Sequence, residues 1–136
     1  MYMNKIKVVL GKLTFSNKAY KIFDISTINF LDKISQEIIK NKEYSKYTDI
    51  ITFAFFIRKK NLIKISREYK SKNQIIGRGS AFHVAPSNIP INFAYSLVFG
   101  LLSGNNNIVR LPSKNFIQTN IPVSYTHLTL PTIYSV

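Results

Sequence analysis

The stretch that decides the fold is "FHVAPSNIPINFAYSLVFGLLSGNNNIVRLPS", residues 82–113. A buried-looking apolar run ends at Ala85, and a polar corner bracketed by Pro86 and Pro90 follows it. A long apolar segment comes next, and then a second short apolar run that stops at Pro112. A strand, a tight corner, a buried helix and a second strand form one βαβ unit. The sequence therefore predicts an α/β fold with a parallel sheet.

The punctuation of this stretch predicts where its elements begin and end. Pro90 suits the first position of a helix, and Gly104 suits the left-handed position that ends one. We expect a strand over 82–85 and a helix over 90–103. A second strand over 108–111 should pair in parallel with the first.

The region before this unit reads as a short lead-in followed by helices. "KIKVVLGKL", residues 5–13, alternates lysine with apolar residues and predicts a strand. Asp24 or Ser26 can cap a helix over 27–42, in which apolar residues recur at helical spacing. A second helix is expected to open at Thr48 or Asp49 and to run through residues 50–70, with a buried first half and a solvated charged face on its second half.

The composition narrows the function classes. The net charge is +13, from 19 Lys and Arg against 6 Asp and Glu, so a polyanionic partner has to be considered. The lysines are scattered, however, and their number follows partly from the AT-rich codons shared with Ile, Asn, Tyr and Phe. The chain has no cysteine and two histidines, and the histidines have no carboxylates near them in sequence. We therefore expect no metal site, no disulfide and no nucleic-acid partner.

The apolar segments are short, and the last residues differ from the rest. No apolar run reaches the roughly 20 residues of a membrane span, and no signal peptide is visible, so we expect a cytoplasmic protein. Residues 123–136 carry no charge, and "VSYTHLTLPT" resembles a sequencing adapter read in frame. We therefore predict an N-terminal region over 1–72, the start of a nucleotide-binding domain over 73–122 and a non-native tail over 123–136. The chain would then be an N-terminal fragment.

The polar corner around Asn88 is the candidate site. In open α/β sheets, ligands bind outside the carboxyl ends of the strands, where helix N-termini offer free N–H groups. A rigid amide donor at that place suits an oxyanion. Alternatively, Asn88 is simply the N-cap of the helix that follows, a position that asparagine favours.

The stretch 82–113 resembles the acyl-CoA reductase family, which includes the fatty-acyl reductases of bacterial luminescence. Upstream, "YTDIITFAFFIRKKNL", residues 47–62, resembles the helix that precedes this unit in those reductases. More distantly, the corner is similar to the Pro-x-Asn-x-Pro corner of the aldehyde dehydrogenase superfamily. The resemblance implies the first βαβ unit of a Rossmann-type nucleotide-binding domain.

The resemblance also implies roles for residues in both loops. Asn88 takes the place of the oxyanion-hole asparagine, the catalytic position. The cofactor-binding positions would be Val84, Ala85, Pro86, Ser87, Arg110, Pro112, Ser113 and Lys114. The dehydrogenases have Lys immediately before Pro-Ser, where this chain has Leu111 and places its basic residue, Arg110, one step earlier. On a strand one step turns the side chain to the other face, so Arg110 does not match the direction of the dehydrogenase lysine.

The implied reaction is the reduction of an activated acyl group, such as an acyl-CoA, to an aldehyde. The reductant would be NADPH, or else NADH, and the acyl group would be carried as a thioester on a cysteine. That cysteine would lie downstream, so this segment alone should be inactive, and the full-length enzyme should be a homo-oligomer. Two alternatives remain: a small basic protein that binds nucleic acid or an anionic surface, and a structural domain without chemistry.

Overall fold

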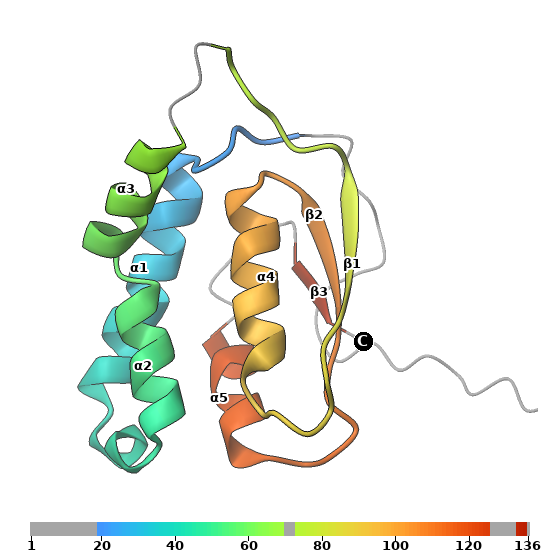
Figure 1. Ribbon diagram of the computed structural model, residues 1–136. Helices are drawn as coiled ribbons and strands as arrows, with labels where there is room; N and C mark the ends of the chain where they lie inside the picture. Colours follow the sequence, from blue (N-terminus) through green and yellow to red (C-terminus); the bar gives the residue numbers. More distant parts are fainter. Residues whose placement is uncertain (1–18, 70–72, 126–132, 136) are drawn as a thin grey trace, which may run out of the picture.

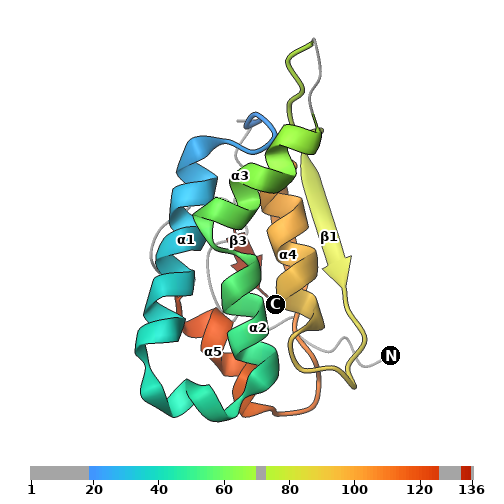
Figure 2. The ribbon, with the colours of Figure 1, turned by 60° about the vertical axis from the view of Figure 1, so that its left-hand side comes forward.

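The computed structural model describes residues 19–69, 73–125 and 133–135. Helices cover one face of a small parallel sheet, and α4 lies between that sheet and the helices α1, α2 and α3 (Figures 1 and 2). The elements, in chain order, are α1 (Ile25–Lys40), η1 (Lys42–Lys46), α2 (Thr48–Phe56), α3 (Lys59–Glu68), β1 (Ser80–Val84), α4 (Asn92–Leu102), β2 (Asn106–Arg110), α5 (Ile117–Tyr125) and β3 (Ile133–Ser135).

The predicted βαβ unit is confirmed. β1 and β2 pair in parallel, in a register that runs from Ser80 opposite Asn106 to Val84 opposite Arg110, and α4 connects them. Both strands begin two residues earlier than expected. The helix begins later, because residues 87–91 form turns and Ile91, not Pro90, occupies the N-cap.

The end of α4 follows the prediction from Gly104. This glycine has φ +75°, and its N–H donates to the carbonyl of Leu101 over 3.0 Å. The next N–H, that of Asn105, donates to the carbonyl of Gly100 over 3.2 Å. These two bonds form a Schellman motif, in which glycine is favoured because it accepts a positive φ without strain.

The apolar run of β1 is buried on one face only. Phe82 and Val84 are 61% and 62% exposed, whereas Ala81 and His83 between them are partly buried. The prediction of a buried run was therefore wrong for half of its side chains. Successive side chains of a strand point to opposite faces, and in the described residues the helices cover only one face of β1.

Helix α1 forms where its cap and its apolar spacing predicted it. The carboxylate of Asp24 accepts a hydrogen bond from the Ser26 N–H over 3.0 Å, which caps the helix. The predicted apolar face, Ile28, Leu31, Ile34 and Ile38, is buried.

The predicted long second helix is broken into α2 and α3, so that prediction was wrong. Arg58 between them is extended, with φ −63° and ψ 141°. Asp32 of α1 accepts a hydrogen bond from the Lys59 N–H over 2.7 Å, and the Asn61 side chain donates to the carbonyl of Phe56 over 2.7 Å. A cap for α3 therefore comes from α1, 27 residues earlier in the chain.

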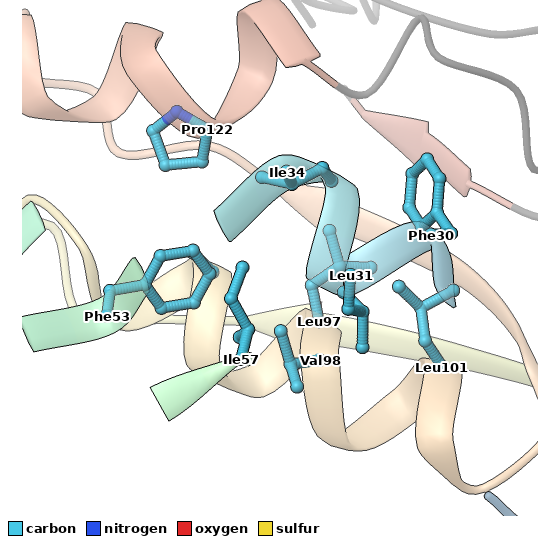
Figure 3. Close-up of a pocket in the computed structure, with 10 residues that line it drawn as sticks. Phe30, Leu31, Ile34, Phe53, Ile57, Leu97, Val98, Leu101 and Pro122 are labelled. Carbon is cyan, nitrogen blue, oxygen red and sulfur yellow. The ribbon is translucent and has the colours of Figure 1, made fainter. Parts of the chain in front are cut away.

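The core lies where α1, α2 and α4 meet. Phe53 and Phe56 of α2 pack on the ring of Tyr95, with centroid distances of 5.1 and 5.3 Å. Burial and the nearby carboxylate of Asp49 raise the pKa of Tyr95, so the ring stays neutral in this packing. A gap of about 20 Å³ lies between these helices and Pro122. Figure 3 shows the apolar side chains that line it. A space of that size and chemistry is a packing defect, because it holds at most one water and offers it no partner.

The last elements were not predicted. α5 runs across residue 123, the expected start of the non-native tail, and contains Pro122. β3 pairs in parallel with β2, which makes β2 the central strand of three. The strand predicted over 5–13 lies outside the described residues. None of the described helices is long and apolar enough to cross a membrane.

Candidate functional site

The predicted site residues gather at one edge of the sheet. Val84 and Arg110 are register partners, so β1 and β2 end side by side at their carboxyl ends. Two segments leave the sheet there: the β1–α4 corner, residues 85–91, and the β2–α5 segment, residues 111–116 (Figure 1). The structure thus brings together two stretches that are separated in the chain by α4 and β2.

Asn88 lies in a turn at the tip of the β1–α4 corner and is exposed. It does not cap α4: the N-cap is Ile91, and no side chain accepts a hydrogen bond from this end of the helix. The alternative that Asn88 is an N-cap is therefore wrong. Within the described parts of the chain, its side-chain amide has no hydrogen-bond partner. The amide is available to a ligand.

The first turn of α4 adds backbone donors beside Asn88. Across the ranges that the structure describes, the N–H groups of Asn92 and Phe93 have no acceptor. The first turn also carries no acidic residue to occupy them. Free N–H groups and the positive end of the helix dipole attract an anion. This edge of the sheet therefore offers free hydrogen-bond donors and carries no carboxylate in the first turn of α4.

The corner itself is held on two sides. Ala85 packs against the core and Ile91 is buried in it, while the exposed residues lie between them. The buried hydroxyl of Thr119 in α5 donates to the carbonyl of Pro90 over 3.0 Å. This contact ties the corner to the segment that follows β2.

The β2–α5 segment carries the remaining predicted residues. Arg110 is exposed on the sheet face that Val84 shares, and Leu111 packs against the core. Arg110 thus lies on the face of the sheet opposite to α4. Pro112 is partly buried, whereas Ser113 and Lys114 are exposed. The contact of these residues with a cofactor stays a prediction.

The sequence reasoning missed three polar residues behind the corner. His83 of β1 bonds to Ser96 of α4 and to Asn107 of β2, over 2.8 and 2.9 Å. The sequence interpretation considered His83 only as a metal ligand. A signal did exist: Ser96 is the one serine within the apolar run of α4, and Asn107 is an amide in a strand.

No other part of the described chain competes with this edge as a catalytic site. A cavity of about 390 Å³ lies at the opposite edge, by the amino ends of the strands. Its lining is mostly apolar and includes Tyr69, Ile76, Arg78, Phe99 and Leu102. Among the described residues, no three His, Cys, Asp or Glu side chains gather as metal ligands. The corner itself holds no cysteine, histidine, lysine or carboxylate, and its Ser87 hydroxyl has no base beside it in the corner, so its chemistry is binding and charge stabilisation.

Comparison with known families identifies the unit. The family model described as acyl-CoA reductase (LuxC) matches residues 18–123. The match covers all of the described helices α1 to α4 and both strands of the βαβ unit. No curated protein and no solved structure matches the chain.

Proposed function

Because the chain belongs to the acyl-CoA reductase (LuxC) family, we propose that it forms part of a nicotinamide-dependent reductase that converts an activated acyl group to an aldehyde. The observation that carries the proposal is the free side-chain amide of Asn88, at the carboxyl end of β1 and beside an uncapped helix. The corner lies within the matched residues 18–123, and it exposes the Asn88 amide and the first N–H groups of α4 without hydrogen-bond partners among the described residues.

We assign Asn88 the role of the oxyanion donor. When hydride adds to a thioester carbonyl, the oxygen gains a full negative charge in the tetrahedral intermediate. A positioned amide stabilises that charge more than it stabilises the neutral carbonyl, so it lowers the barrier to reduction. Collapse of the intermediate releases the aldehyde and the sulfur leaving group. The chain has no cysteine, so we place the cysteine of the proposed enzyme-bound thioester outside it.

The two segments at this edge fit a dinucleotide. Free N–H groups on Asn92 and Phe93 suit a pyrophosphate. Lys114 adds positive charge at this edge, and Arg110 adds positive charge on the other face of the sheet. Neither side chain forms an ion pair with a carboxylate of the described residues. The backbone of residues 84–87 would line the nicotinamide, and residues 112–114 would contact the adenosine ribose. When bound, the cofactor supplies the hydride. The fold implied is a Rossmann-type domain of the aldehyde dehydrogenase kind.

The basic-protein alternative gains little from the structure. The cations of α3, such as Lys60, Lys64 and Arg67, lie on a helix whose one fully buried residue is Leu62. Arg58 stacks on the ring of Phe55 at 4.8 Å, which is a contact within the chain. A charged helix face with an apolar opposite side is the ordinary form of a surface helix.

An activity assay tests the proposal. The complete protein that carries residues 1–122 is incubated with acyl-CoA thioesters of several chain lengths and with NADPH or NADH. We expect oxidation of the cofactor in step with aldehyde formation, and no turnover by the 136-residue chain alone. Failure of the complete, folded protein to reduce any thioester with either cofactor would overturn the proposal.

A further inference from the structure

A polar bridge joins the three elements of the βαβ unit behind the corner. His83 of β1 lies between Ser96 of α4, 2.8 Å from its Nδ1, and Asn107 of β2, 2.9 Å from its Nε2. Asn107 is fully buried, and His83 and Ser96 are partly buried. Both ring nitrogens of the histidine are therefore committed inside the fold.

The hydrogen-bond directions in this bridge follow from its last member. The Nδ2 of Asn107 donates to the carbonyl of Asn105 over 2.7 Å, which leaves Oδ1 as the atom that faces the histidine. A carbonyl oxygen only accepts, so Nε2 of His83 carries the proton and donates it. Nδ1 of the neutral ring then accepts from the hydroxyl of Ser96. The bridge thus specifies one tautomer and one orientation of each side chain.

Gly100 makes room for the bridge. A Cβ at this position would lie 2.0 Å from Oδ1 of Asn107 and 2.7 Å from Nε2 of His83. Gly100 lies one turn after Ser96 on the same face of α4. On this face the helix contacts the sheet through the hydroxyl of Ser96 and the backbone of Gly100. Apolar packing is non-directional, whereas hydrogen bonds of this kind fix both distance and rotation.

We propose that the His83 bridge is a positioning device for the corner that presents Asn88. His83 is the next-to-last residue of β1, and Ser96 lies in the second turn of α4, so the bridge fixes both ends of the connection between them. Without it, α4 is held to β1 by packing alone and can shift along the strand. A shift of that kind moves the uncapped first turn of α4 and Asn88 together. The catalytic consequence rests on the function proposed above, but the positioning does not.

Hydrogen exchange on the 136-residue chain tests the positioning directly. Ser96→Ala removes the hydroxyl, Ser96→Thr keeps it, and Ser103→Ala is the matched control, since that hydroxyl bonds only to the carbonyl of Phe99 in its own helix. For Ser96→Ala we expect exchange at residues 94–98 and 82–84 to accelerate about ten-fold, as for a lost hydrogen bond, and exchange in α1 to change less than two-fold. Ser96→Thr and Ser103→Ala should behave as the parent chain does.

Two results would overturn the positioning role. One is equal acceleration in α1 and α4, which marks a general loss of stability; the other is no acceleration in either. A nitrogen NMR spectrum of His83 gives an independent check, because the bridge requires a proton on Nε2. A proton on Nδ1 of the neutral ring contradicts it, whatever the variants do.

Kinetics in the complete protein separate this inference from the proposed function. If both hold, Ser96→Ala lowers kcat about ten-fold with little change in the KM for cofactor, and Ser96→Thr restores it. If the complete protein reduces no thioester but exchange responds as expected, the proposed function fails and the bridge stands. If reduction proceeds but neither exchange nor kcat responds to Ser96→Ala, the bridge fails and the proposed function stands.

Discussion

The two edges of the sheet are built in opposite ways. At the amino edge, the backbone at Tyr20 lies between Gly77 and Gly104 and bonds to both. The N–H of Gly77 donates to the carbonyl of Tyr20 over 2.9 Å, and the N–H of Tyr20 donates to the carbonyl of Gly104 over 3.2 Å. The side-chain oxygen of Asn105 accepts from the N–H groups of Arg78 and Gly79. Here, backbone and side-chain groups bond to one another.

At the carboxyl edge, the donors are left open. Asn88 and the first N–H groups of α4 have no partner within the described ranges, and the corner between Ala85 and Ile91 is exposed. In the same βαβ unit, Asn105 is a structural acceptor at the amino edge, whereas Asn88 is a free donor at the carboxyl edge. Substitutions at the amino edge should change stability, and those at the carboxyl edge should change activity.

The largest effect is expected from Gly104→Ala. The residue has φ +75°, and a Cβ there would lie 2.1 Å from the carbonyl oxygen of Tyr20, so the substitution adds both backbone strain and a clash. We expect the free energy of unfolding to fall by about 3 kcal/mol or more, measured by denaturant unfolding.

Two other glycines separate these causes. Gly77→Ala meets the carbonyl oxygen of Gly104 at 2.1 Å without a positive φ, and Gly79→Ala meets nothing within 4 Å but has φ +136°. Each should cost less than Gly104→Ala. If the Gly104→Ala chain is as stable as the parent, the close contact between Gly104 and the carbonyl of Tyr20 is wrong.

In the complete protein, Asn88→Ala should affect activity and leave stability nearly unchanged. The loss of one oxyanion donor costs on the order of 100-fold in kcat. The side chain makes no bond within the described structure, so the unfolding midpoint should stay within experimental error of the parent. Asn120→Ala, an exposed asparagine in α5, is the control. Unchanged turnover with a lowered unfolding midpoint would make Asn88 a structural residue.

Asn105→Ala makes the opposite prediction at the amino edge. Its side-chain oxygen accepts from Arg78 N–H over 2.8 Å and from Gly79 N–H over 3.3 Å, and both donors lose their acceptor in the variant. We expect about 1–2 kcal/mol less stability and unchanged kcat. Asn105→Asp, which keeps an acceptor oxygen, should recover most of the loss. A drop in kcat without a drop in stability would break the contrast between the edges.

The sequence predicted what local chemistry determines. The starts and ends of helices depend on nearby residues, such as Asp24, Pro90 and Gly104. The helices that these residues delimit were therefore predicted to within two or three residues. The break between α2 and α3 was missed because it depends on Asp32, which reaches Lys59 only once α1 and α3 have packed. The bridge of His83 was missed for the same reason, since β1, α4 and β2 meet only in the folded unit.

At the site, the sequence could predict position more readily than role. The strand-to-helix corner placed Asn88 at the carboxyl edge, because parallel strands end on the same side of a sheet. Whether its amide was a cap or a free donor could not be read from spacing, since both uses require the same residue at a helix start. The N-cap at Ile91, without a side-chain bond, decided against the cap.

The smallest expected effect concerns the choice of cofactor. It tests whether Lys114, in the β2–α5 segment, also binds an anionic group at the carboxyl edge. Lys114 is exposed at the position where the dehydrogenases, by resemblance, commonly have an acidic residue that binds the ribose hydroxyls. A carboxylate accepts hydrogen bonds from those hydroxyls and repels a 2′-phosphate, whereas a cation attracts the phosphate. We therefore expect the complete protein to prefer NADPH. An exposed ion pair contributes at most about 1 kcal/mol, and reversal of the charge replaces that attraction with a repulsion, so the preference should change by about ten-fold.

The measurement is the ratio of kcat/KM for NADPH to that for NADH, before and after Lys114→Glu. The ratio should fall about ten-fold at low salt and by less at high salt, because salt screens exposed charges. Lys60→Glu on α3, which is exposed and outside both site segments, makes the same change in net charge and should leave the ratio alone. If both variants shift the ratio equally, the preference comes from the overall charge of a basic protein. If neither does, Lys114 is a solvated lysine, and the donors of this edge end at Asn88 and the first turn of α4.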